Sequence, residues 1–178
     1  MALGIDDSSS LKVDTRMRLS HPRLYAVGDV TGLSLLDSTA FSQANVAINS
    51  IVGRESRYDA PWVPRCIHTQ PPIAAVGLPE DEAIKNGIEV NVVSSSMRLT
   101  SDDDRTVIDP EPTFLKAVVD ARSRNLLGCL VVGDHAAVIA NVAAIAIHLK
   151  TPIQQLCDIP LAQPSAADAL MATLRKLH

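Results

Sequence analysis

The sequence predicts an α+β fold, in which helices pack on an antiparallel sheet and a strand–helix unit precedes the sheet. Two apolar stretches, 113–120 and 126–133, are joined by a short polar turn, which is the pattern of a β-hairpin. The next stretch, 134–150, is almost continuously apolar and long enough to form a helix. Because it has few polar positions, we expect this helix to be buried on several sides.

The N-terminal strand and its turn come first in the chain. Residues 24–32, LYAVGDVTG, run from a short apolar strand into a turn that Gly28 permits. Asp29 then stands at the C-terminal end of the strand, where open α/β sheets bind ligands. A carboxylate accepts hydrogen bonds without donating any, so it suits a sugar-like hydroxyl better than a phosphate. Gly-Asp is also common turn chemistry, and this stretch alone favours that simpler interpretation.

A helix and a linker follow. Apolar residues recur at helical spacing over 34–52, with Ser34 placed to cap the N-terminus and Gly53 to end the helix. Residues 55–62 are polar and interrupted by proline, which predicts a linker. The chain therefore divides into an N-terminal piece, 1–54, and a larger domain, 63–178.

The larger domain mixes short strands and helices. In chain order, the sequence predicts two extended pieces within 66–77, a short helix over 79–87, a strand over 88–97, an exposed acidic loop over 101–112, the hairpin, the long helix, a short helix over 151–157 and an amphipathic helix over 164–177. Ser165 is expected to cap this last helix. Lys116 and Asp120 are expected on the exposed face of the hairpin.

Composition excludes several classes of function. A net charge of -4 and a pI near 5.7 argue against a nucleic-acid partner. No apolar run has membrane-spanning length, and a signal-peptide pattern is absent. The cysteines, Cys66, Cys129 and Cys157, are odd in number and far apart, so we expect reduced thiols in a cytoplasmic protein. The histidines show no metal-ligand spacing, so no metal site is predicted.

Four stretches, taken together and in order, resemble a known family. They are RLYAVGDVTG (23–32), IHTQPPIAAVGLPEDEA (67–83), FLKAVVDARSRNLLGCLVVGDHA (114–136) and PLAQPSAADAL (160–170). Their order is similar to that in the C-terminal part of the class I FAD-dependent pyridine nucleotide-disulfide oxidoreductases. This family includes dihydrolipoamide dehydrogenase, mercuric reductase and soluble transhydrogenase.

The resemblance implies a role for each part of the chain. Residues 1–54 would be the end of an FAD-binding α/β domain, and 63–178 the dimerisation domain of a homodimer. The resemblance implies that Asp29 hydrogen-bonds the ribityl chain of FAD. It also places a helix N-terminus at the pyrimidine edge of the flavin ring, at Leu36, Asp37 and Ser38. Asp37 departs from the small or neutral residue usual there, and we expect it to turn outward as a helix cap.

The terminal motif departs further from the family pattern. The family's proton relay is a His before a proline with a Glu five residues later, and the aligned residues here are Gln163 and Asp168. An amide does not titrate near neutral pH, so Gln163 cannot pass a proton to a thiolate. The parent enzyme is therefore expected not to be a standard dithiol reductase. Hydride transfer between nicotinamides, or to a quinone, becomes the expected chemistry.

The sequence also lacks the family's Gly-rich FAD loop, redox-active CxxxxC motif and NAD(P) loop. We therefore expect a longer parent that binds FAD and uses NAD or NADP, and we expect this chain alone to be inactive and free of flavin. The alternative is a stand-alone homodimeric interaction module without catalytic activity.

Overall fold

The computed structural model describes residues 10–58, 63–97, 113–163 and 165–177. The chain divides into two compact units, Met1–Val63 and Pro64–His178, and each is described here by itself.

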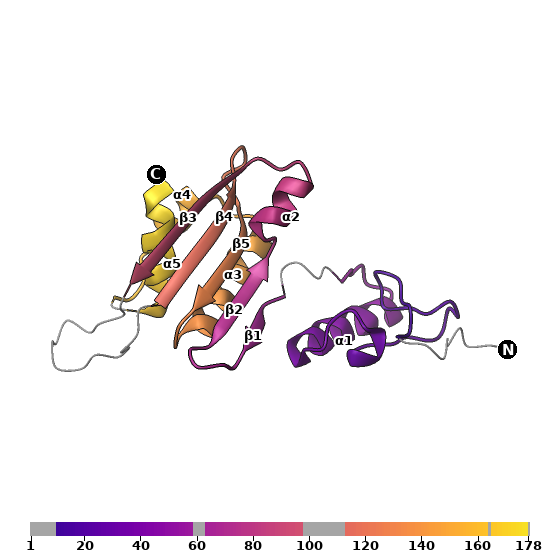
Figure 1. Cartoon of the computed structure of the whole chain (residues 1–178). Helices are drawn as coiled ribbons and strands as arrows, with labels where there is room; N and C mark the ends of the chain where they lie inside the picture. The colour runs from indigo at the N-terminus through magenta and orange to yellow at the C-terminus, as the bar shows by residue number, and fades with distance from the viewer. Residues whose placement is uncertain (1–9, 59–62, 98–112, 164, 178) are drawn as a thin grey trace. The chain divides into compact units, whose positions relative to one another are not determined.

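The described part of the first unit consists of one helix, one short turn and connecting loops (Figure 1). The helix is α1 (Asp37–Ile51), and the turn is the 3-10 element η1 (Asp29–Thr31). The expected strand over 24–27 is not formed, because only an isolated antiparallel bridge joins Arg18 to Tyr25. A single bridge lacks the neighbouring strands that stabilise a sheet, so this segment remains a loop.

The ends of α1 agree only partly with the expectation. Leu36 is the N-cap and provides no side-chain cap, so the assignment of Ser34 to this role is wrong. The Ser34 hydroxyl instead accepts a hydrogen bond from Thr39 Oγ1 at 3.1 Å. The predicted stop is confirmed, because the helix ends at Ile51 and Gly53 follows with a φ of 76°.

The second unit is built on a five-stranded antiparallel sheet with the strand order β1-β2-β5-β4-β3. The strands are β1 (Arg65–Ile67), β2 (Ile73–Gly77), β3 (Val90–Met97), β4 (Thr113–Asp120) and β5 (Leu126–Val132). The helices are α2 (Glu80–Lys85), α3 (Ala136–Leu149), α4 (Ile153–Cys157) and α5 (Ala166–Leu174), followed by η3 (Arg175–Leu177). This confirms the predicted α+β class and the order of its elements.

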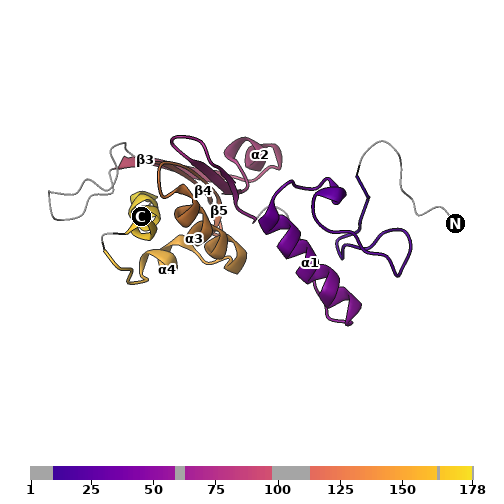
Figure 2. The same cartoon turned by 90° about the horizontal axis from the view of Figure 1, so that it is seen from below.

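Helices α3, α4 and α5 lie together on one face of the sheet, as Figure 2 shows. Their apolar side chains and those of the strands form a mainly aliphatic core, in which Cys129 is also buried. The expectation that the long helix is buried on several sides is wrong for the single chain. Ile139 and Ala143 of α3 are fully buried, whereas Val138, Ile145 and Leu149 are 50%, 62% and 65% exposed.

Two further expectations concern the hairpin and its surroundings. Lys116 is not simply a surface residue, because it is partly buried and its Nζ lies 2.5 Å from Glu80 Oε2. Asp120 closes the hairpin turn, since its Oδ1 accepts hydrogen bonds from the backbone of Arg122 and Ser123.

The acidic loop expected over 101–112 lies outside the described residues. Within the described residues, none of the helices is long and apolar enough to cross a bilayer.

Candidate functional site

The turn around Asp29 is fixed by two glycines and by local hydrogen bonds. Gly28 has a φ of 80° and Gly32 a φ of 65°, values that residues with side chains seldom adopt. The Gly28 carbonyl accepts hydrogen bonds from the Thr31 amide at 3.0 Å and the Thr31 hydroxyl at 2.8 Å. The backbone on both sides of Asp29 is therefore held in one conformation.

A buried glutamine connects this turn to α1. Gln43 is fully buried, and its Oε1 accepts a hydrogen bond of 2.6 Å from the Gly28 amide. Its Nε2 donates to Thr31 Oγ1 at 3.5 Å. Sequence analysis missed Gln43, although a signal was present. Gln43 lies on the same helix stripe as the buried residues Thr39 and Ala47, and a polar residue on a buried stripe indicates an internal hydrogen bond.

The Asp29 side chain is exposed. Its main-chain carbonyl accepts a hydrogen bond from the Gly32 amide, but its carboxylate bonds to none of the described residues. The carboxylate is therefore available to a ligand. Its assignment to a ribityl hydroxyl stays a prediction.

The start of α1 lies beside the same turn. A Cβ built on Gly28 would meet the Cβ of Ala40 at 3.6 Å, so the first turns of α1 approach the glycine closely. Asp37 points outward as expected, but it is the first residue of α1 and not its cap, which is Leu36. Its Oδ1 accepts a hydrogen bond of 2.7 Å from the Ser38 amide. Because Leu36 provides no side-chain cap, other N–H groups of the first turn remain available to an external acceptor. The structure thus brings the Asp29 turn and the predicted flavin-facing helix end together.

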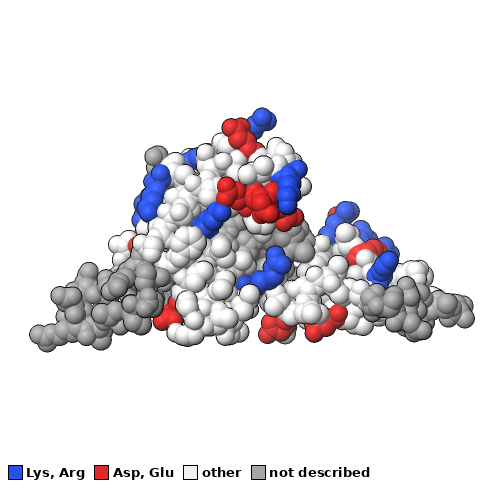
Figure 3. Space-filling view, in the orientation of Figure 1, with Lys and Arg blue, Asp and Glu red and all other residues white. Residues whose placement is uncertain are grey.

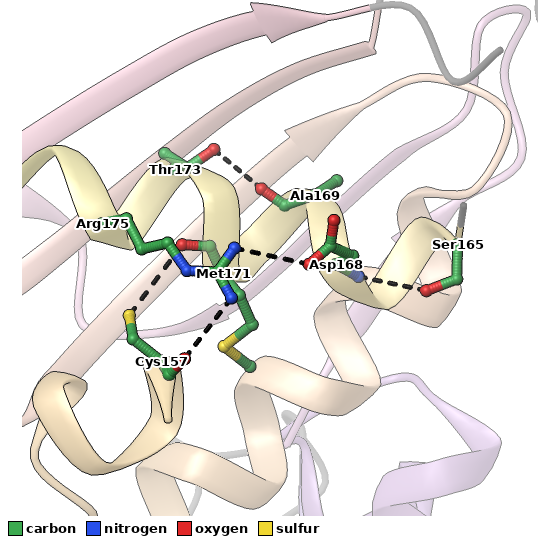
Figure 4. Close-up of polar contacts among 7 residues, drawn as sticks. All are labelled: Cys157, Ser165, Asp168, Ala169, Met171, Thr173 and Arg175. Carbon is green, nitrogen blue, oxygen red and sulfur yellow. Dashed lines mark hydrogen bonds and ion pairs between the residues drawn. The ribbon is translucent and has the colours of Figure 1, made fainter. Parts of the chain in front are cut away.

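The C-terminal motif forms a second polar cluster, around α5 (Figure 4). Ser165 caps this helix as predicted, because its Oγ accepts a hydrogen bond of 3.2 Å from the Asp168 amide. The Asp168 carboxylate turns toward Arg175, with Oδ1 at 3.5 Å from Nη1. Arg175 Nη2 also donates to the Cys157 carbonyl at 3.4 Å. Sequence analysis did not identify Arg175, which lies seven residues after Asp168, two helical turns along.

The structure does not join the two residues at the family's relay positions. Gln163 is exposed, and no hydrogen bond between described residues links it to Asp168. The Oδ1 atom of Asp168 is buried and accepts no hydrogen bond, so its partner is the Arg175 charge alone. Within one chain, Gln163 and Asp168 therefore do not form a hydrogen-bonded pair.

The thiols do not form a reactive centre. Burial raises the pKa of the Cys129 thiol to about 12, and burial also raises the pKa of Cys157. A thiol with a raised pKa is a poor nucleophile at neutral pH. All three cysteines are free, and the part of the chain that the structure describes holds no cluster of residues able to bind a metal ion.

Three large apolar residues of α3 are exposed, on the side of the helix that also carries its polar residues Asn141 and His148. Val138, Ile145 and Leu149 are spaced by seven and four residues, so they lie along one side of the helix. Large apolar side chains that line up in this way on a surface mark a contact site. We call these three residues the α3 stripe.

The profile described as "Pyridine nucleotide-disulphide oxidoreductase, dimerisation domain" matches residues 63–174. Among curated relatives, a dihydrolipoyl dehydrogenase of Thermus scotoductus is 30% identical over 174 residues, covering 98% of this chain and 37% of the relative. One from Chlorobaculum tepidum is 28% identical over 171 residues, covering 95% and 36%. The chain thus spans little more than a third of the length of these relatives.

Solved structures show a similar fold. LpdA from Mycobacterium tuberculosis matches with a TM-score of 0.84 at 24% identity, covering 95% of this chain and 37% of that one. The HOCl-induced flavoprotein disulfide reductase RclA from Escherichia coli matches with a TM-score of 0.81 at 21% identity, covering 99% and 40%.

Proposed function

Because the chain belongs to the pyridine nucleotide-disulphide oxidoreductase family, we propose that it is the C-terminal region of an FAD-dependent, NAD(P)-linked oxidoreductase that acts as a homodimer. Residues 63–178 form the contact between two subunits, and residues 1–54 complete the FAD-binding domain. In that domain Asp29 holds a ribityl hydroxyl. The flavin's pyrimidine edge meets the helix end formed by Leu36, Asp37 and Ser38.

The α3 stripe is the observation that carries this proposal. Val138, Ile145 and Leu149 are each at least half exposed in the single chain, although the opposite side of α3, with Ile139 and Ala143, belongs to the core. Each of these side chains stabilises a complex by roughly 1 kcal/mol when a partner surface covers the part that is still exposed to water. A second copy of the same helix supplies a matching apolar surface, since a two-fold contact places the same patch on both subunits.

The first unit supports the view that a larger FAD domain completes it. Phe41 and Ile48 of α1 are 78% and 57% exposed, on the opposite side from the buried Gln43. A short unit with one helix cannot cover both sides of that helix. We infer that the upstream part of the parent protein covers this side.

The terminal motif supports the proposal that the parent is not a standard dithiol reductase. Gln163 cannot accept or release a proton near neutral pH, and the Asp168 carboxylate is paired with Arg175. Neither side chain can supply the base that a dithiol substrate needs. Hydride transfer between nicotinamides or to a quinone does not require that base. With the full-length gene product, we expect slower turnover of dihydrolipoamide than of a quinone, and the reverse order would refute this assignment.

Light scattering at micromolar concentration tests the subunit contact. The chain is expected to have the mass of a dimer, and Ile145→Glu, which places a charge in the α3 stripe, to give a monomer. Ile84→Glu is the matched control, because Ile84 is 58% exposed against 62% for Ile145 but lies on α2. A monomer mass for the unsubstituted chain would disprove the proposed contact.

A visible absorption spectrum tests the cofactor. The full-length gene product is expected to be yellow from bound FAD, whereas this chain alone is expected to be colourless. A full-length product without flavin would favour the stand-alone interaction module.

A further inference from the structure

The face of the sheet opposite α3, α4 and α5 contains a cavity of about 390 Å³, between α2 and the central strands. Ala75 and Gly77 are alternate residues of β2 and line it on the same side. Gly77 is also paired with another glycine, Gly128 of β5. The cavity lies over Ala75, whose side chain is a single methyl group and leaves this part of the face unfilled.

Apolar groups surround this hollow and remain exposed to water. Val118 and Leu130 line it from the neighbouring strands, and Ile84 lines it from α2. Leu130 is 36% exposed and Ile84 58% exposed. A ligand with an apolar body would cover both side chains, which is favourable in proportion to the area removed from water.

The charged groups at the cavity are paired, with one exception. Lys116 Nζ lies 2.5 Å from Glu80 Oε2, and Asp81 Oδ2 lies 3.6 Å from Lys85 Nζ. Figure 3 shows acidic and basic side chains gathered near α2 on this face of the molecule. Arg65 also lines the cavity, and its side chain forms no hydrogen bond or ion pair with another described residue. Its guanidinium is therefore the charged group left for a ligand.

We propose that this cavity binds a small organic carboxylate, with its apolar body on Ala75, Gly77 and Leu130 and its carboxylate on Arg65. A guanidinium matches a carboxylate in two parallel hydrogen bonds, which favours this anion over a neutral group. The volume lies near the lower end of the range of about 300–1,000 Å³ for ligand sites, which suits one ring with a short chain.

The inference does not depend on the proposed function. All of the lining residues belong to the second unit, and the α3 stripe lies on the helix-covered side of the sheet (Figure 2). A dimer formed through α3 therefore leaves this cavity open.

Titration of the whole chain with 4-phenylbutanoate, followed by heteronuclear NMR and calorimetry, tests the proposal, and 4-phenylbutanol is the neutral analogue. We expect saturable binding that shifts the backbone signals of β2 and β5. The acid is expected to bind roughly tenfold more tightly than the alcohol, the difference that a charge-assisted pair makes. Arg65→Gln is expected to abolish that difference and to leave alcohol binding unchanged.

Two further variants make the test specific. Arg122→Gln removes an exposed arginine from the hairpin turn, away from the cavity, and should leave both affinities unchanged. Ala75→Leu fills the floor of the cavity and should weaken both ligands. Equal affinity of the unsubstituted chain for acid and alcohol, shifts confined to other elements, or binding that does not saturate would each overturn the proposal.

Discussion

Substitution of Gly77 by alanine should destabilise the second unit severely, because that position combines a left-handed backbone with close contacts. Gly77 has a φ of +79°, and an added Cβ would lie 2.1 Å from the Leu127 carbonyl oxygen and 2.9 Å from Gly128 Cα. Both contacts are with backbone atoms, so a change of rotamer cannot relieve them. The same Leu127 carbonyl accepts a hydrogen bond of 2.8 Å from the Leu78 amide, and moving it would disrupt that bond.

The cost can be built up from these contributions. An alanine in the left-handed region costs about 1–2 kcal/mol. Overpacking against neighbours that yield only partly adds about 1–3 kcal/mol, and a weakened hydrogen bond adds about 1 kcal/mol. The expected loss is therefore about 3–6 kcal/mol, a large fraction of the roughly 5–15 kcal/mol that stabilises a typical domain. Gly87→Ala is the matched control, because Gly87 has a φ of +73° but open space around it.

Urea unfolding followed by far-ultraviolet circular dichroism measures both variants at one protein concentration, since dimerisation makes stability concentration-dependent. Gly87→Ala should lose only the conformational cost of about 1–2 kcal/mol. The added Cβ at Gly77 would also lie 2.8 Å from Ile147 Cδ1 of α3, so Gly77→Ala should weaken the dimer as well. An equal loss of stability in the two variants would refute the steric reasoning.

Two other substitutions test the cofactor residue and the buried thiol. In the full-length parent, Asp29→Ala should weaken FAD binding by about tenfold to a hundredfold, because one charge-assisted hydrogen bond is lost; an unchanged dissociation constant would remove Asp29 from the site. Burial raises the pKa of Cys129 from 9.0 to about 12, so between these values only the unfolded thiol ionises, and stability should fall as the pH rises through this range. Unfolding free energies should show a shallower pH dependence for Cys129→Ala, and identical slopes would contradict a buried thiol.

Local pattern was sufficient wherever an element is defined by its own residues. The hairpin of β4 and β5 follows from two apolar stretches and a polar turn, and the stop of α1 follows from Gly53. Segment 24–27 shows the limit of this reasoning. Its residues favour a strand, but a strand forms only when neighbouring strands complete its hydrogen bonds.

Site residues divide in the same way. Ser165 could be selected from sequence because its capping role depends only on the helix start that follows it. The cofactor role of Asp29 stays a prediction that rests on the family resemblance. Gln43 acts on Gly28, fifteen residues away in the chain, and Arg175 acts on Asp168 and on the Cys157 carbonyl of α4. These contacts depend on how elements pack, and periodicity alone does not define them.

The sequence by itself determined the α+β class, the order of the elements and the family, since each depends on residues that are close in the chain or on motifs in a fixed order. Only the tertiary structure decided how much of α3 is buried, because its two polar residues, Asn141 and His148, do not show that Ile145 beside them is exposed as well. Likewise, the strand register was needed to pair Gly77 with Gly128. It was also needed to place Arg65 at the cavity between α2 and the central strands. Register is a property of neighbouring strands, and no single stretch of the chain contains it.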